Sequence, residues 1–297
     1  MTNTETEDKN TKIQKTANTL YDLLDHTDIP FVKDISDFLD NNYGEIGQNR
    51  ISTPNFSALI VSRFLTNHSV LEMAAQKYGK DLQVIELGAG FTPHYLNIGT
   101  EINKYIEVEF EENSKIKEEV TKTLTQNKNI YFVGGDILSL STWNKIESLI
   151  DKNKPVFIFS EGTIAQYFNS EQKEFVASMM KKLMICEGSI FALDDTLRNH
   201  PELSDNPIIK EGMGRIVSIS GNNIYNKEVT TFKDEFEKWG RLLGTENYSV
   251  NYVLSKPEMD FAIESLKLTV CAVDNNKDLS SELIKLSNEN KNKRIWK

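Results

Sequence analysis

Apolar side chains recur at helical spacing over the first quarter of the chain. One stripe begins at Leu20 and a second begins at Phe31. A longer pattern of the same period predicts a helix over residues 55–78, and Gly79 is a natural stop for it. This part of the chain shows no strand pattern. We therefore expect an N-terminal helical cap over residues 13–80.

After Asp81 the pattern changes to strands and helices in alternation. Strands are expected at 82–87, 104–109, 129–133, 155–160, 189–193, 248–254 and 266–273. Helices are expected near Pro93, at 113–126 and 141–151, from Ser170, and at 232–243. Such alternation predicts an α/β fold with a doubly wound, mostly parallel, seven-stranded Rossmann-like sheet below the helical cap.

The ends of the chain differ from this pattern. Residues 1–12 are polar and are expected to be a disordered tail, and residues 281–297 form a polar, basic tail. The sheet domain is expected over 81–280. Within it, residues 196–230 have a loop-like composition. A loop of that length either lines or closes a substrate pocket or is an ordinary surface insertion.

Charge and composition exclude several classes of function. The 297 residues carry a formal net charge of −10, which disfavours binding to nucleic acid. The two cysteines and four histidines show none of the spacings typical of metal sites or disulfide frameworks. No apolar run is long enough to span a bilayer, and the polar N-terminus is unlike a signal peptide. No metal, no membrane partner and a cytoplasmic location are expected.

A glycine turn follows the first strand. Gly88, Ala89 and Gly90 come directly after the apolar run that ends at Leu87. Ligands of open α/β sheets bind at the carboxyl ends of the strands, and glycine lets a ligand approach the backbone closely. The full dinucleotide fingerprint is not met, because position 93 is proline. This lowers the case for NAD or FAD.

Acidic residues follow the second and third strands. Glu109 ends the second strand and can accept both hydroxyls of a ribose, with Glu107 as the alternative. Asp136 can accept from an adenine amino group, while the backbone N–H of Ile137 meets a ring nitrogen. A solvated acid and a helix N-cap are the plain alternatives. A glycine turn followed by two acids predicts binding of S-adenosylmethionine, and Glu161, after the fourth strand, is expected to face its methionine end.

At these positions the chain resembles the leucine carboxyl methyltransferase family, which includes bacterial O-methyltransferases of polyketide biosynthesis. The similar motifs are LGAG at 87–90, EVEF at 107–110, GDI at 135–137, and EG at 161–162 ahead of Tyr-Phe at 167–168. The resemblance covers roughly residues 45–195. It implies that residues 81–280 form an S-adenosylmethionine-binding methyltransferase domain.

The resemblance also implies a role for each site residue. Gly88 would lie against the methionine part of the cofactor, Glu109 would hold the ribose, Asp136 and Ile137 the adenine, and Glu161 the amino group. The family uses an arginine of the cap to pair with the cofactor carboxylate. Arg50 is the first candidate for that role and Arg63 the second.

Three positions depart from the family pattern. Glu109 replaces an aspartate, Glu111 replaces a proline, and Thr92 replaces an aspartate. The first change keeps a carboxylate, so it leaves the expected chemistry of the ribose site intact. Together the three differences weaken the expected assignment of a subfamily and a substrate more than they weaken the expected cofactor.

The predicted reaction is an in-line SN2 methyl transfer to a carboxylate or hydroxyl of a small molecule or peptide. A carboxylate acceptor needs no general base, whereas a hydroxyl does. The side chains considered for that base are His94, His200, Tyr167 and Asp195, and none is assigned. Two alternatives stay open: an NAD-dependent oxidoreductase on a similar sheet, and a non-catalytic partner-binding protein that kept the fold.

Overall fold

A computed structural model describes residues 9–44, 54–194, 232–243, 246–253 and 267–274, together with positions 282 and 285. Three helices come first: α1 (Lys9–His26), α2 (Val32–Tyr43) and α3 (Pro54–Tyr78). The strands are β1 (Gln83–Leu87), β2 (Lys104–Glu109), β3 (Ile130–Gly134), β4 (Val156–Ser160), β5 (Ile190–Asp194), β6 (Glu246–Val253) and β7 (Lys267–Asp274). Between the strands lie α4 (Glu111–Leu124), α5 (Leu140–Leu149), α6 (Ile164–Tyr167), α7 (Ser170–Leu183) and α9 (Phe232–Leu243).

In the described residues, seven strands form one sheet in the order β3-β2-β1-β4-β5-β7-β6. The first five strands pair in parallel, and β7 pairs antiparallel with both β5 and β6. The prediction of an α/β fold with a parallel sheet and N-terminal helices is confirmed. The chain winds outward from β1 to β3 and then returns to β4 on the other side of β1. The strand order therefore reverses between β1 and β4, the place where open α/β sheets bind ligands.

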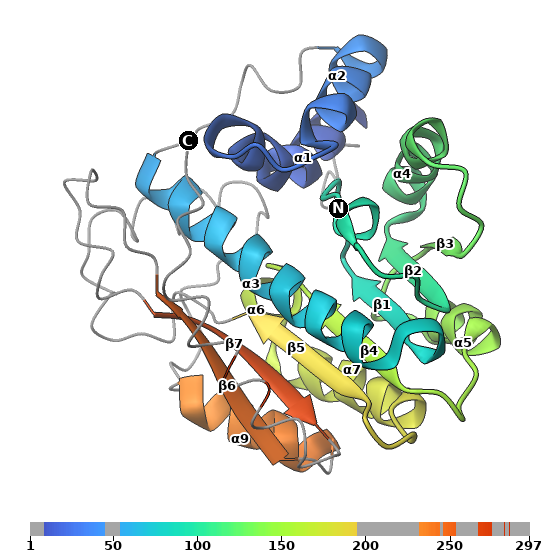
Figure 1. Cartoon of the computed structure of the whole chain (residues 1–297), viewed down its shortest axis with the longest axis vertical. Helices are drawn as coiled ribbons and strands as arrows, with labels where there is room; N and C mark the ends of the chain where they lie inside the picture. Colours follow the sequence, from blue (N-terminus) through green and yellow to red (C-terminus); the bar gives the residue numbers. More distant parts are fainter. Residues whose placement is uncertain are drawn as a thin grey trace, which may run out of the picture.

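Helices cover both faces of the sheet (Figure 1). On one face, side chains of α5, α7 and α9 pack with the odd-numbered apolar positions of β1, Ile85 and Leu87. On the other face, α3 packs against β4, β5 and β7, and its residues cluster with Val84 of β1. The alternation of burial partners along β1 follows the period of two in a strand. Since both faces are covered, β1 and β4 are buried over their whole length.

The first two helices form a layer beside the carboxyl ends of the strands (Figure 1). Their apolar side chains, including Leu20 and Ile35, pack with Phe64 of α3, with Phe91 after β1, and with Val120 of α4. This cluster explains why the N-terminal segment folds as helices, because its apolar stripes have a place to be buried. Among the described residues, no helix is both long and apolar enough to cross a bilayer.

The structure differs from the sequence prediction in a few places. The helix expected near Pro93 is only a single 3-10 turn, Tyr95–Asn97. The side-chain amide of Asn97 donates to the carbonyl oxygens of Pro93 and Pro30, which closes the turn and stops it from propagating. Helix α1 begins at Lys9, before the expected boundary at residue 13. The predicted loop at 196–230 lies outside the described residues.

Candidate functional site

The turn after β1 has the backbone conformation that its glycines allow. Gly88 and Gly90 have φ values of 71° and 54°, in the left-handed region that other residues rarely adopt. The backbone N–H of Gly88 donates to the carbonyl of Val108 at 2.9 Å, which ties the turn to β2. A side chain at Gly88 would overlap that of Thr163, which follows β4. The glycine therefore lets the ends of β1 and β4 approach closely.

Glu109, at the end of β2, is held by backbone groups of two turns. Its Oε2 accepts from the N–H of Gly90 at 3.0 Å, and its Oε1 accepts from the N–H of Phe110 at 2.9 Å. Burial raises the pKa of this carboxyl, while the two N–H groups act to lower it. The carbonyl of Glu109 also accepts from Gly135, which links β2 to the turn after β3. The side chain of Asn113 also hydrogen-bonds to this carboxyl group.

The turn after β3 carries Asp136 and Ile137. The Asp136 side chain is exposed, and its Oδ1 accepts from the N–H of Leu138 at 2.8 Å. The Ile137 side chain is buried, and its carbonyl accepts from the indole N–H of Trp143 at 2.8 Å. These bonds fix the turn, and the side chain of Asp136 stays exposed. Because Glu109 pairs with Gly134 and accepts from the N–H of Gly135, this turn follows β3 at the same edge of the sheet as Glu109.

Glu161 follows β4 and is buried between an arginine and a histidine. Its Oε1 lies 3.3 Å from Nε of Arg63 on α3, and its Oε2 lies 2.9 Å from Nε2 of His94. Burial acts to raise the pKa of Glu161, but the hydrogen bond from His94 and the charge of Arg63 outweigh it and hold the pKa below its usual value. Glu161 is therefore ionised at neutral pH. The other arginine candidate, Arg50, lies outside the described residues.

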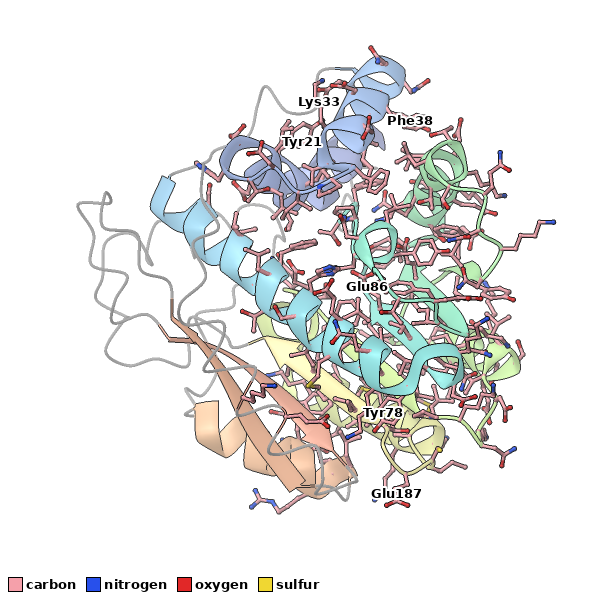
Figure 2. The ribbon with its side chains drawn as sticks, viewed as in Figure 1. Tyr21, Lys33, Phe38, Tyr78, Glu86 and Glu187 are labelled. Carbon is pink, nitrogen blue, oxygen red and sulfur yellow. The ribbon has the colours of Figure 1, made fainter. Side chains whose placement is uncertain are left out.

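Two more carboxyl groups lie below this edge, on the face of the sheet that α3 and α4 cover. Glu86, labelled in Figure 2, is buried and accepts from the hydroxyl of Tyr105 at 2.6 Å. Burial and the nearby Glu107 raise its pKa well above the ordinary value. Burial likewise raises the pKa of Glu107 to about 7, although Lys117 acts to lower it. The chain thus places four glutamates at or below the carboxyl ends of three adjacent strands.

Lys117 of α4 neutralises part of this charge and shapes the glycine turn. Its Nζ lies 3.7 Å from Oε2 of Glu107 and donates to the carbonyl oxygens of Gly90 and Thr92. The side chain is 2% exposed, which is rare for lysine. The predicted helix at 113–126 did not single out Lys117. The signal was present, since Lys117 shares the apolar face of Ile116 and Val120.

Sequence analysis also missed two apolar side chains near the site. Phe110 follows Glu109 and is 63% exposed, and Leu140, shortly after Asp136, is 57% exposed. They are two of the three large apolar side chains that are exposed in the described part of the chain. An exposed aromatic residue next to a strand-end acid is visible in the sequence, and its flat ring suits contact with a planar ligand.

The residues considered as general bases are not brought to one place. His94 is fully buried and bonded to Glu161, and Tyr167 is half-buried at the end of α6. His200 and Asp195 lie outside the described residues. Within the ranges that the structure describes, no group of three or more potential ligands could hold a metal ion.

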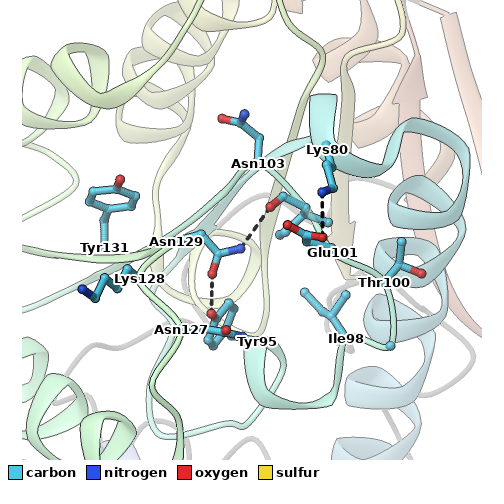
Figure 3. A pocket seen from close by; sticks show the side chains of 12 residues that line it. Lys80, Tyr95, Ile98, Thr100, Glu101, Asn103, Asn127, Lys128, Asn129 and Tyr131 are labelled. Carbon is cyan, nitrogen blue, oxygen red and sulfur yellow. Dashed lines mark hydrogen bonds and ion pairs between the residues drawn. The ribbon is translucent and has the colours of Figure 1, made fainter.

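A cavity of about 660 Å³ lies at the opposite edge of the sheet (Figure 3). It is lined by residues that precede β2 and β3, including Glu101 and Asn129, and by Tyr95. The hydroxyl of Tyr95 donates to Oδ1 of Asn129 across it. None of the predicted site residues lines this cavity. It is therefore separate from the glycine turn and the acidic strand ends.

Among known proteins, the chain is similar to solved structures that share its fold. No protein-family model matches the chain, and no curated protein matches it. A solved structure from Thermobifida fusca YX, assigned as a methyltransferase, is 12% identical with a TM-score of 0.57 over 88% of this chain and 94% of the other. A DUF574 family protein from Streptomyces avermitilis MA-4680 is 12% identical, with a TM-score of 0.56 over 87% and 96%.

An O-methyltransferase family protein from Burkholderia thailandensis is 11% identical, with a TM-score of 0.50 over 89% of this chain and 72% of the other. At such identities the likeness concerns the fold and leaves the reaction open. The resemblance to the leucine carboxyl methyltransferase family stays a prediction, and so do the roles of the site residues. The chain has the fold of the class I S-adenosylmethionine-dependent methyltransferases.

Proposed function

We propose that this chain is an S-adenosylmethionine-dependent methyltransferase that methylates an oxygen atom, carboxylate or hydroxyl, of a small molecule or peptide. The observation that carries the proposal is the ion pair of Arg63 and Glu161 beside the glycine turn, at the point where the strand order reverses. The amino-acid end of the cofactor is a zwitterion. Arg63 would bind its carboxylate and Glu161 its ammonium, so both charges find a complement.

The nucleoside end of the cofactor fits the neighbouring strand ends. Glu109 is oriented by two backbone N–H groups and by the side chain of Asn113, and its carboxylate would accept from the ribose hydroxyls. Asp136 would accept from the adenine amino group, and the N–H of Ile137 would meet a ring nitrogen. Phe110 and Leu140 offer exposed apolar surface for the adenine ring beside these groups.

In methyl transfer from a sulfonium, the main task of the protein is to align the acceptor with the methyl group. The sulfonium methyl is already activated, so binding residues need to hold the cofactor, place the acceptor in line and exclude water. Glu109, Arg63 and Glu161 would fix the cofactor on both sides of its sulfur. We assign no general base, because a carboxylate acceptor is ionised at neutral pH and needs none. The resemblance to carboxyl methyltransferases supports such an acceptor.

A thermal-shift comparison tests the cofactor. S-adenosylhomocysteine should raise the melting temperature, since a ligand at about 100 times its Kd stabilises the folded state by about 2.7 kcal/mol. NAD at the same concentration should leave the melting temperature unchanged. Stabilisation by NAD and not by S-adenosylhomocysteine would overturn the proposal in favour of the oxidoreductase alternative.

A matched pair of variants tests the placement. Arg63→Met should weaken S-adenosylhomocysteine at least about tenfold, because a charge-assisted pair is worth about 1.5–3 kcal/mol. Arg50→Met should leave the affinity close to that of the parent protein. Equal affinities for Arg63→Met and the parent would show that another group binds the cofactor carboxylate. Transfer of a labelled methyl group to a panel of carboxylic acids and phenols then separates an enzyme from a non-catalytic binding protein.

A further inference from the structure

A chain of three side chains runs from the end of β4 into α3. Oε2 of Glu161 lies 2.9 Å from Nε2 of His94, and Nδ1 of His94 lies 3.3 Å from Nδ1 of His68. Nε2 of His68 in turn lies 3.7 Å from a carboxylate oxygen of Glu72, on the partly exposed side of α3. The two imidazoles therefore lie in a row between the buried strand end and the partly exposed side of the helix.

Aromatic rings fix the orientation of His94. Its ring stacks on Phe64 with centroids 4.0 Å apart and an interplanar angle of 19°, and it meets the edge of Phe159 at 5.2 Å. The side chain is fully buried. With one ring above it and one ring edge beside it, the imidazole has little freedom to rotate, so its two nitrogens stay directed at Glu161 and His68.

The two imidazoles are neutral at neutral pH. Burial lowers the pKa of His94, although Glu161 acts to raise it and the charges of Lys117 and Arg63 act to lower it further. Burial and the neighbouring His94 lower the pKa of His68 to about 3, against a hydrogen bond with the backbone of Asn97. A neutral imidazole has one N–H donor and one bare nitrogen acceptor.

The hydrogen-bond partner of His94 then determines its tautomer. Ionised Glu161 can only accept, so His94 carries its proton on Nε2 and donates to Glu161. Nδ1 of His94 is left as an acceptor, and its 3.3 Å contact with His68 is a hydrogen bond when His68 carries its proton on Nδ1. Both N–H groups are then directed toward the carboxylate of Glu161, and the hydrogen bond from His68 helps to hold His94 in the tautomer that donates to Glu161.

We propose that His94, held by His68, is the positioning residue that fixes the carboxylate of Glu161 for the ammonium group at the amino-acid end of the cofactor. This inference rests on the proposed function. A neutral donor suits the task, because it orients the carboxylate without cancelling the negative charge that attracts the ammonium. When the cofactor carboxylate engages Arg63, the bond from His94 keeps Glu161 in place.

Two variants and two ligands test the inference. His94→Phe keeps the stacked ring and removes the donor, whereas His94→Gln restores an N–H. S-adenosylhomocysteine carries the amino-acid end, and 5′-methylthioadenosine lacks it. Calorimetric titration of His94→Phe should show S-adenosylhomocysteine weakened about 10–100-fold and 5′-methylthioadenosine changed less than about twofold, with most of the loss recovered in His94→Gln.

The pH profile provides a readout that a merely structural role would not change. His94 helps to hold the pKa of Glu161 below its usual value, so without the donor this carboxyl protonates at higher pH. The loss of S-adenosylhomocysteine affinity on acidification should therefore begin at higher pH in His94→Phe than in the parent protein. His68→Phe should shift the profile in the same direction by less, and His68→Asn, which can donate from a similar position, should not.

Several results would overturn the inference. An equal loss for both ligands in His94→Phe would assign the residue to folding, and an unchanged affinity for S-adenosylhomocysteine would show that Glu161 does not depend on it. If the parent protein binds both ligands equally, the amino-acid end is not recognised; this inference then fails together with the roles given to Arg63 and Glu161, whereas binding of the nucleoside end stands. If the parent protein binds neither, the proposed function itself fails.

Discussion

The two faces of β1 and β2 differ in chemistry over the carboxyl-end half of the strands, whereas at their start Val84 and Tyr105 make the face toward α3 apolar as well. On the face toward α5 and α7 the strands present apolar residues such as Ile85 and Ile106, which are completely buried in one cluster. On the face toward α3 and α4 the same two strands present Glu86, Glu107 and, at the end of β2, Glu109. One face contributes stability, whereas the other holds buried carboxyl groups that cost free energy.

The difference indicates which edge of the sheet is suited to a binding site. Buried carboxyl groups are weak contributors to stability, and well-packed apolar residues in their place are often equally good or better. Their position is not random, since they lie at or just below the turn that the cofactor would contact. Departures from simple apolar packing at one edge of a sheet are expected where a site is built.

The largest effect is expected from removing the one lysine on the polar face. Lys117→Met removes the cation that lowers the pKa of the buried Glu107, so this carboxyl loses its partner, and the carbonyls of Gly90 and Thr92 lose their donor. At pH 8 the free energy of unfolding should fall by about 3–5 kcal/mol. Urea unfolding measures this free energy, and the double variant Lys117→Met/Glu107→Gln should recover part of the lost stability. A double mutant as unstable as the single one would show that the two side chains do not interact.

On the apolar face, Ile106→Ala should lower the free energy of unfolding by about 2–5 kcal/mol, because it opens a cavity in a fully buried cluster. The folded variant should still bind S-adenosylhomocysteine like the parent protein, since the residue faces away from the glycine turn. Titration under conditions where the variant remains folded checks this. Weakened binding at unchanged stability would contradict the separation of the two faces.

Glu107→Gln should change how stability depends on pH. The pKa of Glu107 is about 7 in the folded protein, above its unfolded value, so the native state holds this proton more tightly. Its contribution is fully present below about pH 4.5 and is lost as pH rises through 7, a change of up to roughly 3 kcal/mol. The stability of the parent protein relative to Glu107→Gln should therefore fall over this range. A constant difference would show that Glu107 does not titrate there.

The smallest effect is expected from Glu86→Gln. Burial and the nearby Glu107 raise the pKa of Glu86 well above its ordinary value and so favour the neutral form, which an uncharged amide of the same size resembles. The free energy of unfolding at pH 7 should change by less than about 1 kcal/mol. A loss several times larger would indicate that Glu86 is ionised and that the polar face holds more charge than described.

The sequence predicted the layout of the sheet well because local signals determine it. The second strand was placed at 104–109 and the helix after the long loop at 232–243, as observed. Apolar runs ending in glycine or acid marked the strand ends, and the parallel order brings those ends to one edge. The prediction of a helix near Pro93 was wrong, because a proline followed by a short apolar stretch can begin either a full helix or a single turn.

The contacts inside the site could not be predicted in the same way. The pairs of Glu161 with Arg63 and with His94 join residues 98 and 67 positions apart. Nothing in the local pattern tells which arginine of the cap faces the end of β4. The family resemblance placed Arg50 ahead of Arg63. His94 was considered as a base, whereas the structure bonds it to Glu161. Only the packing of α3 over the sheet brings these groups together.

The most direct test of the account is a calorimetric titration of S-adenosylhomocysteine into the Glu109→Ala and Glu112→Ala variants beside the parent protein. Glu109 is held at the end of β2 by two backbone N–H groups, and Glu112 is an exposed acid three residues further on. The account predicts one binding site in the parent protein, at least about tenfold weaker binding in Glu109→Ala, and parent-like binding in Glu112→Ala. Parent-like binding in both folded variants would contradict a cofactor site at this edge of the sheet.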